Sequence, residues 1–163
     1  MTNPRRRVRL EEPMAEEFRR ALTEEEVVLF LGQSNHSIFA TINPDGTPHM
    51  TPIGYEYDRG VFNISTTTDK VKYRNVRGDS RVSLLVRGQL PGEPGEAVVM
   101  ASGPATVERD EGLAVFQRIA GRGSSPEVAQ RLYEDRKDEP RVVICFRPTK
   151  MLTWVQIGRS AVS

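Results

Sequence analysis

The sequence predicts a mainly β fold, an antiparallel barrel or strongly coiled sheet of six to seven strands with helices at its periphery. Two observations predict it. Short apolar runs follow one another through turns of two to four residues, as in sequential β-hairpins. Segments with helical spacing and capping residues are confined to the front, the middle and the last third of the chain, so helices can cover such a sheet but cannot form its core.

The chain is expected to open with a flexible charged extension over residues 1–12, which has no apolar period. Residues 13–163 are expected to form a single domain, because a chain of this length buries a sizeable core without a second one. The first helix is predicted to begin at Thr23, since Glu26 follows at the spacing of a capping box, and Gly32 can end it.

Three strands joined by tight turns are predicted next. The sequence NPDG separates the first strand from the second, DRG separates the second from the third, and both carry residues that turns favour. Pro52 lies inside the second strand and removes one ladder donor, which predicts an edge, a bulge or a bend at that point. The three predicted strands are residues 37–43, 48–58 and 61–66.

The second half of the chain is predicted to add the remaining strands and two more helices. Asp110 can cap one helix, which Gly121 ends, and Ser125 followed by Pro126 is typical of the start of the other. A bend is expected within one long strand at Gly103, which precedes a proline. The predicted strands are residues 81–87, 97–109, 141–146 and 151–157, and the predicted helices are residues 111–121 and 126–136.

Charge and composition exclude several classes of function. With 23 basic and 22 acidic residues the formal net charge is +1, which argues against a nucleic-acid or membrane partner. No apolar run approaches the roughly 20 residues of a membrane span. The single cysteine, Cys145, fits a reducing compartment, so a cytoplasmic protein is expected. No metal site is predicted, because neither histidine has neighbours at metal-ligand spacing.

The segment STTTDKVKYRNV, from Ser65 to Val76, is the strongest candidate for a binding site. Its hydroxyl residues stand just before a predicted short helix, where unpaired backbone amides carry partial positive charge. These hydroxyls and amides, together with Lys70 and Lys72, could hold phosphate oxygens. The alternative is a polar loop leading into a solvated helix, with Asp69 balancing one lysine, and the residues by themselves leave it open.

The order of these segments resembles a known family. The stretch FATINPDGTPHMTPIGYEYDRGVFNISTTTDKVKYRNVRGDSRVSLLV is similar to the pyridoxamine-phosphate-oxidase-like (PNPOx-like), FMN-binding split β-barrel family, and within it to the actinobacterial branch assigned to coenzyme F-420, a deazaflavin. The resemblance continues through ASGPATVERD and PTKMLTWVQ and so covers roughly Thr23 to Arg159. It implies a homodimer of split barrels with a flavin or deazaflavin in each of two clefts at the interface.

The resemblance also implies which residues contribute to the cofactor cleft, from this chain or from its partner. They are, along the tricyclic ring, Met50, Thr51 and Pro52; beside the ribityl chain and the phosphate, Ser65, Thr66 and Thr67; at the phosphate itself, Lys72 supported by Lys70 and Asn75; and elsewhere in the cleft, Arg87, Trp154 and Gln156. Lys70, Lys72, Arg74 and Arg77 would supply charge for the long acidic tail of a deazaflavin.

The expected activity is that of an oxidoreductase, an F-420-dependent reductase that passes a hydride to an unsaturated small organic substrate. No catalytic residue is predicted, because such a cofactor carries the chemistry and the protein binds and orients it. A proton could come from solvent, Tyr55, Tyr57 or His49. The alternatives are an FMN-dependent oxidase of the pyridoxamine-phosphate-oxidase type, a non-catalytic flavin or deazaflavin carrier, and, more distantly, a haem protein.

Overall fold

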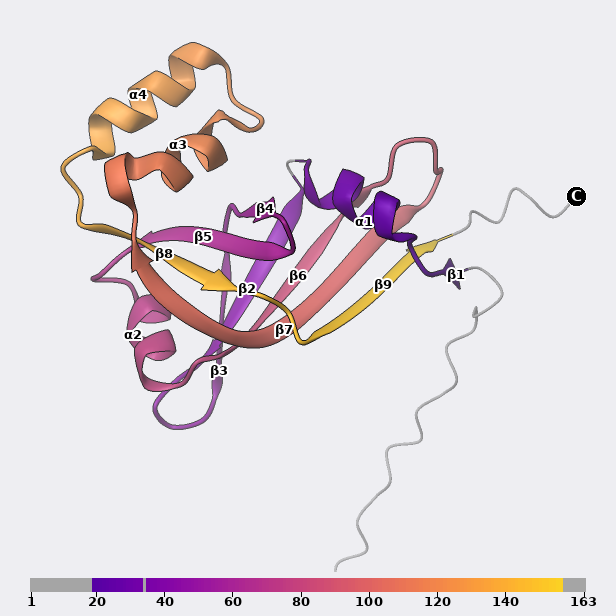
Figure 1. Ribbon diagram of the computed structural model, residues 1–163, viewed down its shortest axis with the longest axis horizontal. Coiled ribbons are helices and arrows are strands. Elements are labelled where there is room, and N and C mark those ends of the chain that lie inside the picture. The colour runs from indigo at the N-terminus through magenta and orange to yellow at the C-terminus, as the bar shows by residue number, and fades with distance from the viewer. Residues whose placement is uncertain (1–18, 34, 157–163) are drawn as a thin grey trace, which may run out of the picture.

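In this computed structural model, residues 19–33 and 35–156 are described, and they form one coiled antiparallel sheet with helices around it (Figure 1). The mainly β class with peripheral helices is confirmed, and so is the split-barrel architecture that the resemblance implied. The predicted extension over residues 1–12 lies outside the described residues, so the division of the chain into an extension and one domain stays a prediction.

The sheet runs in the order β3, β2, β6, β7, β8, β5, β4, with β9 paired to β7 and β1 paired to β9. Each of these pairings is antiparallel. The strands in the described part of the chain are β1 (Arg19–Arg20), β2 (His36–Ile42), β3 (Pro48–Pro52), β4 (Glu56–Asp58), β5 (Val61–Thr67), β6 (Arg81–Gln89), β7 (Glu96–Arg109), β8 (Arg141–Phe146) and β9 (Lys150–Gln156).

The long strand β7 turns this sheet into a barrel, and Figure 1 shows its curvature. Residues 97–102 have β6 on one side and β9 on the other, whereas residues 105–109 pair with β8. The change of partner strand falls at Gly103 and Pro104, where the sequence predicted a bend. Only glycine fits at the first of these positions, because a Cβ atom would lie 2.9 Å from the carbonyl oxygen of Arg147.

Aromatic side chains from both halves of the barrel fill its interior. Phe39 on β2, Phe62 on β5 and Phe146 on β8 are all fully buried. The rings of Phe62 and Phe146 stack with centroids 5.0 Å apart, and the Phe39 ring lies 6.4 Å from that of Phe146. Because these strands are far apart in the sequence, this contact holds the closed form of the sheet together by burying apolar surface.

The number of strands differs from the prediction of six to seven, because the described residues form nine. One addition is the two-residue β1, which is too short to leave a periodic pattern. The other arises because the strand predicted over residues 48–58 is two strands: β3 pairs with β2, and β4 pairs with β5. The chain crosses between them through Gly54, where a Cβ atom would lie 2.7 Å from the Cγ2 atom of Ile119.

Helices cover the barrel at the predicted places. They are α1 (Glu24–Leu31), α2 (Val71–Gly78), α3 (Ala114–Gly121) and α4 (Pro126–Arg136), with a short 3-10 turn η2 (Glu111–Leu113) before α3. Thr23 and Glu26 form the predicted capping box of α1, and the hydroxyl of Ser125 accepts a hydrogen bond from an amide in the first turn of α4. α3 and α4 form a hairpin on one side of the sheet (Figure 1), called here the α3–α4 hairpin. Among the helices of the described residues, none has the length and apolar character needed to cross a membrane.

Candidate functional site

A hollow of about 380 Å³ lies where β5 ends and α2 begins, and it is called here the β5–α2 cavity. The end of α4 and the start of β8 form its other wall. Five of the twelve residues predicted for a cofactor cleft line it together. The lining residues are Ser65, Thr66, Thr67, Asp69, Lys70, Lys72, Arg136, Glu139, Pro140 and Arg141.

Two of the three hydroxyl residues of this cavity are held by neighbouring carboxylates. Ser65 Oγ donates to Asp110 Oδ2 over 3.2 Å, and the Thr67 hydroxyl donates to the carboxylate of Asp69. The hydrogen bond from Thr67 and the nearby Lys70 lower the pKa of Asp69 to about 2. Asp69 is therefore ionised at neutral pH and offsets the charge of Lys70, whose Nζ lies 3.0 Å from its Oδ2.

Lys72 differs from Lys70 because it has no carboxylate partner within the described part of the chain. It is half-buried, and burial first, then the charge of Lys70, lowers its pKa. A lysine of a solvated helix would not show the effect of burial. An anion entering the cavity would supply the missing counter-charge, so the surroundings of Lys72 favour the anion site over the polar loop that the sequence left open.

The remaining cations of the cavity were not identified from the sequence. Arg141, the first residue of β8, has a side chain only 8% exposed. Its Nε atom donates to Ser65 Oγ over 3.1 Å and its Nη1 atom to Glu139 Oε2 over 2.5 Å. Arg136 lies near the same carboxylate, with 3.7 Å between Nη1 and Oε1. The only signal for Arg141 is the pairing of β8 with β5, which places it opposite Thr67, and no local pattern encodes that register.

Asn75, predicted to support the phosphate, has another role in the fold. Its side chain is buried, and its Nδ2 atom donates to Thr41 Oγ1 over 3.0 Å and to Asn43 Oδ1 over 2.9 Å. The amide therefore ties α2 to β2 and to the turn that follows β2. Asn75 is not among the residues that line the β5–α2 cavity.

A second group of predicted residues lies on the outer side of the sheet. Strand register and alternation place Met50, Pro52, Arg87, Trp154 and Gln156 on this side, whereas Thr51 pairs with the fully buried Phe39. The middle of this side is an apolar hollow of about 330 Å³. The apolar face is defined here by Ile38, Ala40, Met50, Leu85, Met100 and Leu152.

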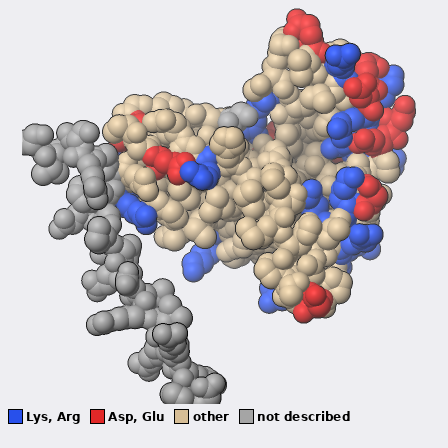
Figure 2. Space-filling model, turned by 180° about the vertical axis from the view of Figure 1, so that it is seen from behind, with Lys and Arg blue, Asp and Glu red and all other residues tan. Residues whose placement is uncertain are grey.

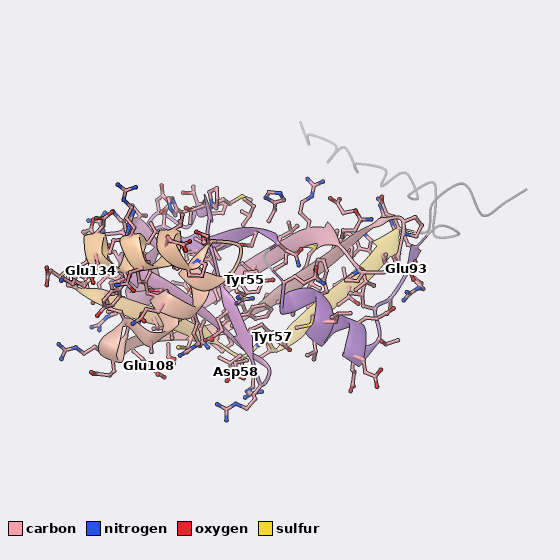
Figure 3. The ribbon with its side chains drawn as sticks, turned by 90° about the horizontal axis from the view of Figure 1, so that it is seen from above. Tyr55, Tyr57, Asp58, Glu93, Glu108 and Glu134 are labelled. Carbon is pink, nitrogen blue, oxygen red and sulfur yellow. The ribbon has the colours of Figure 1, made fainter. Side chains whose placement is uncertain are left out.

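Three of the predicted residues lie at the far end of this outer side, beside the β6–β7 loop. Arg87 Nη2 lies 2.7 Å from Glu96 Oε1, the Arg19 guanidinium covers the Trp154 ring at 5.4 Å, and Gln156 pairs with Arg19 in the sheet. Figure 3 labels Glu93 in this loop and Glu134 on α4 at opposite ends of the molecule. One chain therefore does not bring these three residues to the β5–α2 cavity.

The side chains considered as proton donors are not among the residues that line this cavity. Tyr55 is buried in the core, and burial raises its pKa to about 12. Tyr57 packs on Phe62, with ring centroids 4.7 Å apart, and Figure 3 shows both tyrosines near the middle of the molecule. His49 lies on β3. Within residues 19–33 and 35–156, no three histidine, cysteine or acidic side chains are placed to hold a metal ion.

Charge is distributed unevenly over the surface. In Figure 2 the lysines, arginines and acidic residues crowd the side that carries the α3–α4 hairpin and α2, whereas the adjoining area in that view is largely uncharged. The β5–α2 cavity belongs to the charged side, because the end of α4 and the start of α2 line it. A ligand with an ionised group would meet its counter-charges there.

Comparisons with known proteins agree with this fold. A conserved hypothetical protein from Mycobacterium tuberculosis has a TM-score of 0.65 and 24% identity over 86% of this chain and 88% of its own. An F420 reductase has a TM-score of 0.54 and 23% identity over 77% of this chain and 94% of its own. An FAD-binding protein from Mesorhizobium loti has a TM-score of 0.60 and 18% identity over 86% of this chain and 99% of its own.

The sequence itself matches a family model. The model is described as pyridoxamine 5′-phosphate oxidase, and it matches residues 23–155, which include every strand from β2 to β8 and most of β9. This span agrees with the extent of the resemblance found in the sequence. The chain therefore belongs to the pyridoxamine 5′-phosphate oxidase family, whose split barrel serves flavin-binding oxidoreductases.

Proposed function

We propose that this protein is an oxidoreductase that binds the deazaflavin coenzyme F-420 and transfers a hydride to an unsaturated small organic substrate. The observation that carries the proposal is Lys72, a half-buried cation without a carboxylate partner in the described chain, in a cavity lined by three hydroxyl residues. That combination suits a phosphate group, which the cofactor has. The structural likeness to an F420 reductase supports the choice of cofactor.

In this proposal the residues of the chain bind and orient, and a bound deazaflavin supplies the hydride chemistry. Lys72 holds a phosphate oxygen, and the hydroxyls of Ser65 and Thr66 lie beside it in the same cavity. Ser65 is held in place by Asp110 and Arg141, so its position does not depend on the ligand. Fixing two flat molecules face to face supplies much of the rate in such a reaction.

Beyond the cavity, α2 carries further positive charge. Arg74 and Arg77 are exposed on this helix and do not line the β5–α2 cavity. They are therefore available to the acidic tail of a deazaflavin as it leaves the phosphate site. FMN carries the same phosphate but no such tail, so it remains the alternative cofactor, and the likeness to an FAD-binding protein keeps flavins in consideration.

We also propose that two copies of the chain pair through the apolar face. Met50, Met100 and Leu152 on this face are 65%, 43% and 55% exposed. Contiguous apolar surface of this kind is characteristic of protein interfaces. A second copy of the chain would cover this face. Pairing would also explain why the predicted residues fall into two separated groups, because the group at the β5–α2 cavity of one chain would form a single cleft with the outer-side group of its partner.

The test of the proposed function is a titration of the purified protein with coenzyme F-420 and with FMN, followed by absorbance and fluorescence. Binding of F-420, with turnover of at least one of a panel of enones and quinones when the cofactor is supplied in its reduced form, is the expected result. Tight retention of FMN without any response to F-420 would overturn the cofactor choice. Binding of F-420 without turnover across the panel would instead support a carrier.

A further inference from the structure

The Arg141 side chain is only 8% exposed, and its charge is only partly satisfied. Its Nε and Nη1 atoms are paired with Ser65 and Glu139, whereas Nη2 has no hydrogen-bond partner among the described residues. In that part of the chain the only fully buried side-chain nitrogen or oxygen without a partner is the Tyr55 hydroxyl. Nη2 therefore keeps some accessible surface, and Arg141 lines two cavities from which a ligand could reach it. A charged donor with no protein partner can form a charge-assisted hydrogen bond to an anion in such a cavity.

The guanidinium is held rigidly in this position. Its Cζ atom lies 4.1 Å from the centre of the Phe116 ring on α3. Ser65, which accepts from Nε, donates in turn to Asp110. Asp110 also accepts from the amides of Val115 and Phe116 over 3.0 Å and 3.1 Å. A donor fixed in advance loses little conformational freedom when a ligand binds, which favours affinity.

Arg141 forms part of two cavities, and their charges decide where an anion would bind. The second cavity, of about 500 Å³, lies on the side of the α3–α4 hairpin and has three cations, Arg109, Lys137 and Arg141, against three carboxylates, Asp110, Glu111 and Glu139. The β5–α2 cavity has four cations, Lys70, Lys72, Arg136 and Arg141, against two carboxylates, Asp69 and Glu139. Of the two cavities that Arg141 lines, the β5–α2 cavity is the one with an excess of positive charge.

We propose that Arg141 is a second anion-binding residue of the β5–α2 cavity, where it and Lys72 bind one phosphoryl group from two different walls. Lys72 contributes a point charge from α2, and Arg141 contributes the directed donor Nη2 from β8. Glu139 holds the other end of the same guanidinium and limits its positive field. The inference rests on the proposed function only for the identity of the molecule that carries the phosphoryl group.

The first experiment uses inorganic phosphate and pyrophosphate as probes at constant ionic strength, with affinity measured by NMR titration. Arg141→Met should weaken binding roughly tenfold to a hundredfold, as expected for the loss of a charge-assisted hydrogen bond. Glu139→Gln breaks the same ion pair from its other side but leaves the guanidinium, so it should tighten binding by roughly threefold or more. Arg141→Lys keeps the charge without the fork and should fall between wild type and Arg141→Met.

Opposite changes in the two variants distinguish a ligand-binding residue from a structural one. If Arg141 only stabilises the fold, Arg141→Met and Glu139→Gln should lower the melting temperature and leave phosphate affinity unchanged or weaken it alike. That result, or wild-type protein that binds neither phosphate nor pyrophosphate, would overturn the inference. If Arg141→Met fails to fold, the other two variants still test the inference. Phosphate should bind more tightly to Glu139→Gln and more weakly to Arg141→Lys than to wild type, and the opposite changes would contradict the inference.

A second experiment separates this inference from the proposed function. FMN and riboflavin differ only in the phosphate, so Arg141→Met should weaken FMN binding much more than riboflavin binding. Coenzyme F-420 and 8-hydroxy-5-deazariboflavin form a second pair, whose members differ in the acidic tail as well as in the phosphate. Equal losses within each pair would overturn the role of Arg141. Phosphate binding that depends on Arg141, without binding of either flavin or deazaflavin, would overturn the proposed function and leave this inference standing.

Discussion

Ser65 and Asp110 lie 45 residues apart in the sequence and are joined by a hydrogen bond of 3.2 Å between Ser65 Oγ and Asp110 Oδ2. Ser65 belongs to β5 and lines the β5–α2 cavity, whereas Asp110 precedes α3 and accepts from two amides of that helix. This contact links the α3–α4 hairpin to the wall of the candidate site. Residues that stabilise the hairpin therefore also set the position of groups in the cavity.

We expect Asp110→Ala to destabilise the protein by about 1–3 kcal/mol, because it leaves two helix amides and the Ser65 hydroxyl without their acceptor. Urea denaturation measures this change. Asp110→Asn retains one carbonyl oxygen and should lose less. Equal stability of wild type and Asp110→Ala would show that water replaces these bonds without cost.

Lys72→Ala should weaken cofactor binding by roughly tenfold to a hundredfold, since it removes a charge-assisted hydrogen bond to the phosphate. Stability without cofactor should change little, because Lys72 has no carboxylate partner among the described residues. Arg74→Ala is the matched control, since Arg74 lies on the same helix but outside the cavity. Fluorescence titration gives both affinities, and small, equal losses would return this segment to a solvated helix.

Cofactor affinity should also depend on the protonation of Lys72. Burial and the charge of Lys70 lower the pKa of Lys72 from its ordinary 10.5. Only the protonated amine attracts phosphate, so affinity should be constant at neutral pH and fall as the pH rises through this lowered pKa. The fall should therefore begin at a lower pH than for an exposed lysine. Lys72→Arg keeps its charge over this range and should abolish the fall; the same fall in that variant would assign it to another group.

Pairing of two chains should bury the apolar face, so light scattering should give about twice the chain mass of 18.3 kDa. Met50→Glu places a charge in the middle of this face and should shift the protein to a monomer. Val128→Glu is the control, because Val128 is 49% exposed on α4, away from the face. A wild-type monomer that still binds the cofactor would remove the two-chain cleft.

Local signals in the sequence predicted much of the fold. The capping box of Thr23 and Glu26, the start of α4 at Ser125 and the bend predicted at Gly103 each depend on residues close together in the chain. The second predicted strand ends at Pro52 on an edge strand, as the proline indicated, whereas the crossing of the chain to a second partner strand was not predicted. Gly54 meets Ile119 of α3, a contact that no window of neighbouring residues contains.

The candidate site divides in the same way. The hydroxyls and lysines of the segment from Ser65 to Lys72 are contiguous, so their clustering around one cavity could be anticipated. Arg141 could not, because it enters the cavity through the register of β5 with β8. Asn75 fits a phosphate ligand by spacing alone, yet its amide is engaged by Thr41 and Asn43 on β2 and in the turn that follows it.

The pairing of β5 with β8 has a consequence for synthesis on the ribosome. Thr67 pairs with Arg141, and Phe62 pairs with Phe146, so β5 receives its second neighbour only after most of the chain has been made. Until then one edge of β5 has unpaired amides and carbonyls, and the Phe62 ring lacks the ring on which it stacks. Barrel closure should therefore be a late step, and nascent chains that end before β8 should be the species that chaperones bind most.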